Sequence, residues 1–211
     1  MSGTEEEIKQ KILNASAKHF FQWGYQRVVV DEIASELGMS KKTLYQYFKS
    51  KEDIFREVLN RRLTIVLCEC ENIVYSKELP FNAKLKNLIL YHSGMLAVLS
   101  PPLMKDLQFK FPELWEKLNE LRLQKIPVLV NDLLEEGMKN GFFRSNIDRQ
   151  LVVLIFTTLI DKLIHPSVLS GVSYTASEIF DEIMKLFYWG LMSEEARKDS
   201  ALQEIQNASK V

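Results

Sequence analysis

Apolar residues recur at helical spacing along almost the whole chain, and this periodicity is the feature that most limits the possible fold. In one stretch, Ile54, Phe55, Val58, Leu59 and Leu63 follow one another at the intervals that place side chains on one face of an α-helix. No stretch shows the sustained alternation of apolar and polar residues that is typical of a half-buried strand. The sequence therefore predicts an all-α protein.

Proline and glycine residues divide this periodic pattern into about nine helices. The predicted helices run approximately over residues 8–23, 31–37, 41–48, 54–73, 81–99, 102–109, 113–140, 148–165 and 175–191. Gly24 follows the first helix, in the position where glycine commonly ends a helix. Pro127 lies inside a predicted helix, where it removes a backbone hydrogen bond and indicates a kink or break.

The overall charge excludes a protein that is basic over its whole surface. The chain has 27 Lys or Arg and 28 Asp or Glu, so its net charge is -1, and a nucleic-acid site must be a local patch. No segment approaches the roughly 18 uninterrupted apolar residues of a membrane span, and the N-terminal segment lacks the apolar core of a signal peptide. We therefore expect a cytoplasmic protein with no membrane segment.

The stretch VDEIASELGMSKKTLYQYF, residues 30–48, has the pattern of a helix-turn-helix motif. Each of its two short helices has an apolar stripe, and Ala34 is small enough to let the helices cross closely. Gly38 can adopt the positive φ of a tight turn, and Ser40 can cap the second helix through its hydroxyl. The second helix, residues 41–48, is therefore a candidate recognition helix.

Basic and hydrogen-bonding side chains gather on and after this second helix. From Lys41 to Arg62 there are seven Lys or Arg against three acidic residues, a local excess of four in a nearly neutral protein. Such side chains can contact phosphates and base edges. Lys49 and Lys51 flank the start of the next helix, where free backbone N–H groups also favour a phosphate.

Two stretches resemble the N-terminal domain of the TetR/AcrR family of bacterial transcription regulators. They are ILNASAKHFFQWGYQ, residues 12–26, and VDEIASELGMSKKTLYQYFKSKEDIF, residues 30–55. The resemblance covers about the first 60 residues and implies a three-helix DNA-binding domain, residues 1–52, followed by a helical ligand-binding and dimerisation domain, residues 53–211. Further along, LEEGMKNGFFRSNIDRQL resembles the family's junction between its seventh and eighth helices.

The resemblance also implies which residues contact double-stranded DNA. The expected DNA-binding residues are Ser40, Lys41, Lys42, Thr43, Tyr45, Gln46, Tyr47 and Lys51. This sequence departs from the family at Val28 and Val29, where many members have a Thr or Ser hydroxyl that caps the next helix and touches a phosphate. Asp31 is a possible replacement for that cap.

A single helix-turn-helix contacts a short segment of groove, so specific binding requires two copies on a pseudo-palindromic operator. The resemblance implies dimerisation through the last two long helices, which are apolar on more than one face. The expected dimerisation residues are Leu151, Leu154, Ile155, Thr158, Leu159, Ile179, Phe180, Ile183, Phe187 and Leu191. The alternative is that these residues form the core of a monomer.

The resemblance further implies that the helices between Phe81 and Asn140 surround a small-molecule ligand. Candidate lining residues are Tyr91, His92, Met95, Met104, Phe109, Trp115, Phe156 and Asp161. Aromatic and Met residues at helical spacing also occur in an ordinary core. His92 and Asp161 are polar residues in apolar surroundings, so each is either a ligand anchor or a core group with its own partner.

The sequence gives little support to an enzyme. His19, His92 and His165 are scattered and lack the spacing of metal ligands, and no glycine-rich phosphate loop or nucleophile motif is present in the sequence. We therefore expect no catalytic residues, no metal and no cofactor.

These features predict a ligand-responsive dimeric transcription regulator, which the resemblance implies is a repressor. It would bind its operator through residues 41–48 and be released by a small apolar or amphipathic ligand. One alternative is a regulator without a small-molecule inducer that responds to a protein partner. Another is a metabolite-binding helical bundle with vestigial DNA binding, which would fail to bind any DNA specifically.

Overall fold

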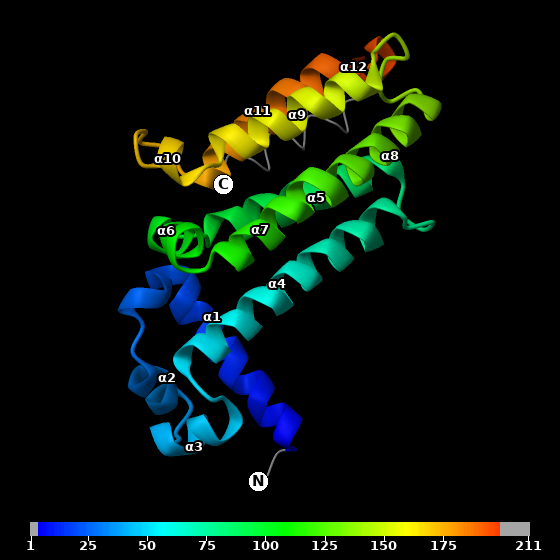
Figure 1. Ribbon diagram of the computed structural model, residues 1–211. Coiled ribbons are helices and arrows are strands. Elements are labelled where there is room, and N and C mark those ends of the chain that lie inside the picture. Colours follow the sequence, from blue (N-terminus) through cyan, green and yellow to red (C-terminus); the bar gives the residue numbers. More distant parts are fainter. Residues whose placement is uncertain (1–3, 199–211) are drawn as a thin grey trace. The chain divides into compact units, whose positions relative to one another are not determined.

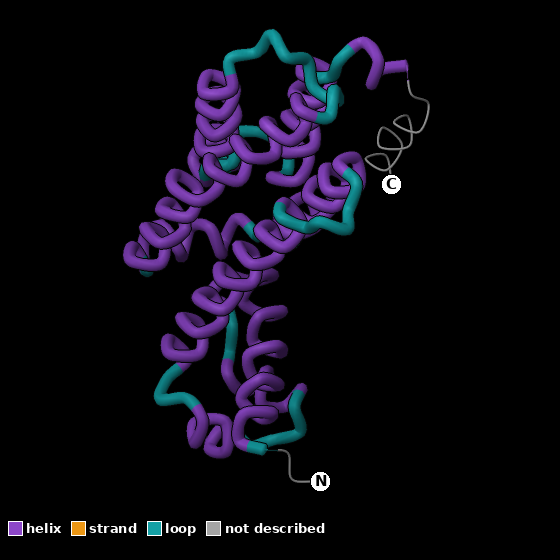
Figure 2. Tube along the Cα trace, turned by 90° about the vertical axis from the view of Figure 1, so that its right-hand side faces the viewer, coloured by secondary structure: helices purple, strands orange, loops and turns teal. Residues whose placement is uncertain are grey.

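The computed structural model describes residues 4–198, and helices make up most of that part of the chain (Figures 1 and 2). No strand occurs among these residues, which contain one isolated bridge between Phe143 and Met192. The prediction of an all-α protein is therefore confirmed. No helix in this range is long and apolar enough to cross a membrane.

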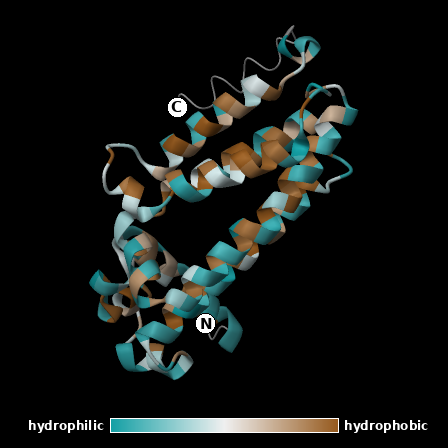
Figure 3. Cartoon of the chain, turned by 45° about the horizontal axis from the view of Figure 1, so that its top comes forward, coloured by the Kyte–Doolittle hydropathy of each residue, from teal (hydrophilic) through white to brown (hydrophobic). Residues whose placement is uncertain are grey.

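The helices follow one another along the chain with short connections. In chain order they are α1 (Glu5–Arg27), α2 (Val30–Glu36), α3 (Lys41–Tyr47), α4 (Lys51–Val74), α5 (Phe81–Ala97), α6 (Pro101–Lys110), α7 (Pro112–Glu120), the π-helical η1 (Leu121–Lys125), α8 (Ile126–Lys139), α9 (Arg149–Leu163), α10 (Pro166–Leu169), α11 (Ala176–Leu191) and α12 (Glu194–Lys198). Hydrophobic positions, brown in Figure 3, alternate with hydrophilic ones at helical intervals, as the sequence pattern predicted.

The chain forms two compact units, which we call unit 1 and unit 2. Unit 1 comprises residues 1–66 and 98–118, and unit 2 comprises residues 67–97 and 119–211. The sequence suggested one boundary between residues 52 and 53 instead. The difference arises because α6 packs on α1 and so joins the N-terminal helices, although α5 separates them in the sequence. Helix α4 begins in unit 1 and ends in unit 2.

The core of unit 1 is formed by apolar side chains from its first four helices together with α6 and α7. Ile12, Phe20, Ile33, Leu44 and Phe55 are completely buried there. The Phe20 and Phe55 rings meet edge to face, with centroids 5.0 Å apart. Because every one of the short helices contributes to this common core, α2 and α3 have fixed positions despite their length.

Gly24 interrupts the helical path of α1, with φ 75° and ψ 173°. The predicted break is confirmed, although the chain resumes a helical path to Arg27. A Cβ atom at position 24 would lie 2.8 Å from Oδ2 of Asp106 and 3.0 Å from the carbonyl carbon of Pro102. Glycine is therefore required both by the positive φ and by the close approach of α6.

The buried carboxylate of Asp106 joins α6 to the end of α1. It accepts hydrogen bonds from the backbone N–H of Gln26 at 3.1 Å and from the Gln26 side-chain amide at 2.7 Å. Asp106 is only 3% exposed, so these bonds replace the water that the charge would otherwise require. No local sequence pattern indicates this contact.

In unit 2, α5 packs on α11, and α9 packs on both α8 and α11. Phe81, Leu85, Leu134, Phe143 and Tyr188 form the centre of its core. A buried ion pair lies beside them, in which the ammonium of Lys84 donates to the Glu136 carboxylate at 2.9 Å and to the Val74 carbonyl at 2.9 Å. Helices α4, α5 and α8 are thereby joined.

The structure divides the predicted helices more finely than the sequence suggested. Residues 113–140 were expected to form one helix with a kink or break at Pro127, but they form α7, the π-helical η1 and α8. Pro127 lies in the first turn of α8, where its missing N–H needs no partner. The chain stays helical across Pro127, and the irregularity immediately before it is the π-helical η1, which ends with the N–H of Ile126 donating to the carbonyl of Leu121.

Candidate nucleic-acid interface

The turn between α2 and α3 has the local geometry that the sequence predicted. Gly38 has φ 64°, and the N–H of Met39 donates to the carbonyl of Ala34 at 2.9 Å. The Ser40 hydroxyl accepts from the backbone N–H of Thr43 at 3.0 Å and so caps α3. Ala34 is buried where α2 meets the core.

Helix α3 has one buried face and one exposed face. Leu44 and Phe48 are buried in the core of unit 1, which orients the rest of the helix. Lys42, Tyr45 and Gln46 are consequently exposed. These three side chains offer an ammonium, a phenol and an amide on a supported helix, the chemistry needed to contact phosphates and base edges.

Two other predicted DNA-binding residues already have partners within unit 1. Lys41 forms an ion pair with Asp31 at 2.7 Å, and this contact raises the pKa of the Lys41 ammonium. The Thr43 hydroxyl lies 2.8 Å from the hydroxyl of Ser40. The suggestion that Asp31 caps α2 is wrong, since Val29 occupies the cap position, no side chain caps α2, and the Asp31 carboxylate faces Lys41 instead.

Lys51 has contacts that differ from those the sequence suggested. Its ammonium donates to the Val28 carbonyl at 2.6 Å and lies 4.4 Å from the centre of the Tyr25 ring. Partial burial lowers the pKa of this ammonium. Lys51 therefore holds the end of α1, and the predicted phosphate contact would require it to leave these partners. Tyr47 is also partly buried and packs against the core of unit 1.

The start of α4 is capped by its own side chains. The Ser50 hydroxyl accepts from the N–H of Asp53 at 3.0 Å, while the Asp53 carboxylate accepts from the N–H of Lys49 at 3.0 Å. Arg56 in the next turn is paired with Glu52 and with a glutamate of α7. Lys42 and Lys49 are therefore the exposed cations that these contacts leave available beside α3.

The predicted ligand-lining residues do not share one unit. Met104 and Trp115 are buried in the core of unit 1, and Phe109 of α6 is 72% exposed. The other five belong to unit 2, and they are Tyr91, His92, Met95, Phe156 and Asp161. Only this second group remains a candidate set within unit 2.

His92 has partners from three helices of unit 2. Its Nδ1 lies 2.9 Å from the Leu88 carbonyl, its Nε2 lies 3.6 Å from the Cys70 sulfur, and its ring stacks on Phe180 with centroids 5.7 Å apart. Burial lowers the pKa of His92 and raises the pKa of the Cys70 thiol to about 11. A neutral imidazole can therefore donate to the carbonyl and accept from the thiol. This arrangement supports the core alternative for His92.

The predicted dimerisation residues fall into two groups. On α9, Leu151, Leu154 and Ile155 are exposed, as is Thr158, whereas Leu159 is half-buried. The corresponding residues of α11 lie mostly inside the protomer, with Phe180, Ile183 and Leu191 buried and Ile179 and Phe187 half-buried.

The exposed apolar residues of α11 are Leu186 and Trp189, which are not among the residues predicted for dimerisation. Their spacing along the sequence could have indicated this exposure. They continue the stripe of the exposed Glu182 and Lys185 at helical spacing, so they belong to the solvent side of an amphipathic helix.

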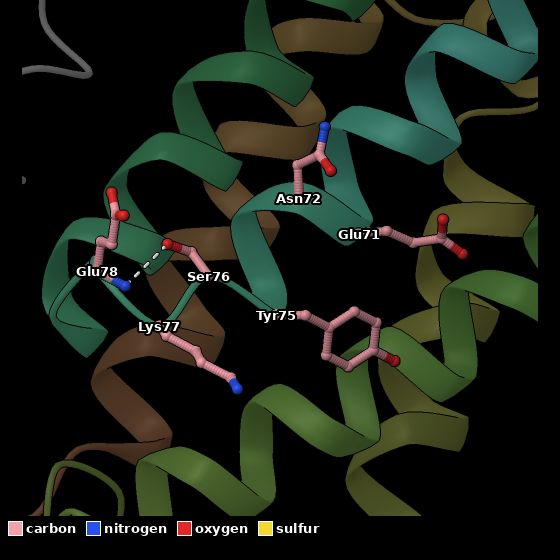
Figure 4. A pocket seen from close by; sticks show the side chains of 6 residues that line it. All are labelled: Glu71, Asn72, Tyr75, Ser76, Lys77 and Glu78. Atoms are coloured by element: carbon pink, nitrogen blue, oxygen red, sulfur yellow. Dashed lines mark hydrogen bonds between the residues drawn. The ribbon is translucent and has the colours of Figure 1, made fainter.

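An open hollow of about 420 Å³ lies where α4 ends (Figure 4). Its lining residues are Glu71, Asn72, Tyr75, Ser76, Lys77 and Glu78. The Tyr75 hydroxyl donates to the Asp132 carboxylate at 2.8 Å, and the Ser76 hydroxyl accepts from the N–H of Glu78 at 3.3 Å. This polar lining differs from the apolar ligand environment that the sequence predicted. Over residues 4–198, no group of three or more His, Cys, Asp and Glu side chains could hold a metal.

Helices α1, α2 and α3 pack on a common core, and α3 is capped by Ser40 and exposes polar side chains. This arrangement places the protein among the helix-turn-helix DNA-binding proteins. Residues 12–58 match the family model described as "Bacterial regulatory proteins, tetR family", and residues 81–190 match that of the "YsiA-like protein, C-terminal region". The chain belongs to the TetR family of bacterial transcription regulators. It is accordingly a DNA-binding regulator and not an enzyme.

Similar proteins align along most of the chain. The fatty acid metabolism regulator protein of Bacillus subtilis is 24% identical over 184 residues, covering 86% of this chain and 94% of that protein. The crystal structure of FadR from Bacillus subtilis in complex with stearoyl-CoA has a TM-score of 0.53 and 24% identity, covering 86% of this chain and 98% of that one. A TetR-family regulator from Marinobacter aquaeolei has a TM-score of 0.67 and 16% identity, covering 96% and 97%. These structural similarities concern the fold.

Proposed function

We propose that this protein is a dimeric, ligand-responsive repressor that binds a pseudo-palindromic operator through α3. The observation that supports DNA reading most directly is the exposure of Lys42, Tyr45 and Gln46 on a helix anchored by Leu44. Gln46 is suited to a bidentate contact with adenine, and Lys42 and Lys49 are suited to phosphates. Binding to chromosomal DNA would place the protein in the cytoplasm.

The exposed apolar stripe of α9 supports dimerisation. Leu151 is 53% exposed and Leu154 is 61% exposed, and α9 contains no fully buried residue although most of its side chains are apolar. A contiguous apolar stripe of this kind commonly marks a protein–protein contact. A second copy packed on α9, and on Leu186 and Trp189 of α11, would cover it and present two recognition helices to one operator.

The response to a ligand is proposed from the family and from one relative. FadR of Bacillus subtilis is described in complex with stearoyl-CoA, which supports an amphipathic ligand for this chain as well. Helix α4 has residues in both units, so a ligand that shifts its second half could change the position of α3. The alternative of a protein partner predicts no recovery of a small molecule with the protein.

Fluorescence anisotropy with DNA that flanks the protein's own gene tests this proposal. We expect tight binding of two protomers to one pseudo-palindromic segment, with affinity that falls steeply as salt increases. Gln46→Ala should weaken this binding by about 1–3 kcal/mol, while the control Gln22→Ala, an exposed residue of α1, should not. Equal affinity for the segment and for unrelated competitor DNA would favour the metabolite-binding alternative.

A further inference from the structure

Arg122 of η1 has an arrangement that is unusual for a long basic side chain. Such side chains normally bury their aliphatic part and keep the charged end in water. Arg122 is partly exposed, but the Nη1 atom of its guanidinium is buried and has no hydrogen-bond partner among the described residues. Arginine stays charged in proteins. Unit 2 therefore contains a partly buried positive charge whose Nη1 donor is unused.

The acidic group that acts on Arg122 does not neutralise it fully. Burial lowers the pKa of the Arg122 guanidinium, and the negative charge of Asp161 opposes that effect. The Asp161 carboxylate, however, forms an ion pair with Lys162 at 2.9 Å. Asp161 thus acts on Arg122 only through space while its carboxylate is paired with Lys162. A buried charge that is incompletely compensated is costly, so the surroundings of Arg122 favour the arrival of an anion.

The position of Arg122 is set by secondary structure. It lies in the π-helical η1, which continues directly into α8 and packs against α9 within unit 2. A π-helical turn widens the helix, and such turns are frequent at functional sites. Asp161 lies on the neighbouring α9. Arg122 therefore lies on an element that packs against the helix carrying Asp161.

We propose that Arg122 is the anchor for the negatively charged end of the regulatory ligand, through hydrogen bonds from its guanidinium to carboxylate or phosphate oxygens. The inference rests on the ligand-responsive function proposed above and specifies the class of ligand as an anionic amphiphile. Removing the positive charge at Arg122 should abolish the preference for an anionic ligand, and should leave the binding of an uncharged apolar chain unchanged.

Isothermal titration calorimetry of the full chain with three probes of equal chain length tests the assignment. Stearate supplies a carboxylate, stearoyl-CoA supplies phosphates, and octadecanol is uncharged. We expect at least one anionic probe to bind about ten-fold or more tightly than octadecanol. The stronger of the two anionic probes identifies the source of the charge.

Two variants with the same change in charge decide whether Arg122 is responsible. Arg122→Gln should lose the anionic preference, Arg122→Lys should restore part of it, and the control Arg144→Gln, an exposed residue of unit 2, should retain it. Equal anionic binding by the two Gln variants would overturn the assignment. Failure of both anionic probes to bind the wild type more tightly than octadecanol would overturn it as well.

The melting temperature of the ligand-free protein provides a second, independent test. If Arg122 lacks a partner, Arg122→Met should raise the melting temperature by a few degrees, because an apolar side chain removes the uncompensated charge. A lower melting temperature than that of Arg144→Met would show that Arg122 is a satisfied structural group. Operator binding by the ligand-free wild type tests the proposed function separately, because failure to bind any DNA specifically would contradict that function without affecting the ligand titrations.

Discussion

The two units differ in how far their side chains find partners within one protomer. In unit 1, the buried Asp106 accepts two hydrogen bonds from Gln26, and Lys51 is held by the Val28 carbonyl. In unit 2, α9 has no fully buried residue, and the buried Nη1 of Arg122 has no hydrogen-bond partner among residues 4–198. The buried side-chain atom of unit 1 without a hydrogen-bond partner among the described residues is the neutral hydroxyl of Ser16, whereas in unit 2 it includes a donor of a charged group, and we propose that a second copy covers α9 and that a ligand reaches Arg122.

Charging the exposed face of α9 should have the largest effect. In Leu154→Lys, the side chain stays in water in the monomer but would be buried in the proposed dimer. We expect a monomer that keeps its helix content and binds the operator about a thousand-fold more weakly, near the level of non-specific binding. Sedimentation velocity and anisotropy would measure both effects.

The control for Leu154→Lys is Leu90→Lys, which changes another exposed apolar residue of unit 2 and should leave a dimer with normal operator affinity. A dimeric Leu154→Lys protein would remove α9 from the interface.

Substituting two glycines of unit 1 in turn would distinguish the cost of backbone strain from the cost of close packing. Gly24 and Gly38 both have positive φ, but a Cβ atom would meet Asp106 and Pro102 only at Gly24, whereas Gly38 faces open space. Gly38→Ala should lower the free energy of unfolding by about 1–2 kcal/mol. Gly24→Ala should lower it by about 2–4 kcal/mol. Equal losses in urea unfolding would show that α6 does not press on α1.

Lys51→Met should lower the stability of unit 1 by about 1 kcal/mol, because the Val28 carbonyl loses a charged donor. The variant also distinguishes the observed contact from the phosphate contact suggested by the sequence. If Lys51 stays on the Val28 carbonyl, the salt dependence of operator binding should not change. A decrease of about one in the slope of log affinity against log salt would indicate a phosphate contact. Lys49→Met, which removes an exposed cation, should show that decrease.

The buried imidazole of His92 predicts that stability depends on pH below its ordinary pKa. Its pKa in the folded protein lies below the ordinary value of 6.5, so the unfolded chain binds more protons over that range. The stability contributed by the neutral imidazole is therefore fully present above 6.5 and declines as the pH falls below it, until the folded-state pKa is passed. Urea unfolding at several pH values should show a shallower decline for His92→Phe. An identical decline in both proteins would exclude His92 as the cause.

Features determined by neighbouring residues could be predicted from the sequence. The positive φ of Gly38 and the cap of α3 by Ser40 depend on residues within one turn, so their residue types were sufficient. The exposed face of α3 followed from the spacing of its apolar residues. The TetR resemblance extended these local features to a function.

Contacts between distant segments could not be predicted in the same way. The bond from Gln26 to Asp106 joins residues 80 positions apart, and no local pattern indicates that α6 returns to α1. The sequence predicts a phosphate contact for Lys51. Its observed contact with the Val28 carbonyl depends on the path of α1, which no local pattern indicates. The burial of the Arg122 Nη1 atom could not be predicted for a similar reason, since it depends on how η1 packs in unit 2.

Hydrogen exchange of the full chain at several protein concentrations, with and without stearoyl-CoA, would test the contrast between the units most directly. We predict that amide exchange in α9 slows as concentration rises, that exchange in η1 slows when the ligand is added, and that exchange in α1 and α2 does not depend on concentration. The account would be contradicted if α9 exchanged at the same rate at every concentration, or if α1 and α2 required the second copy for their protection.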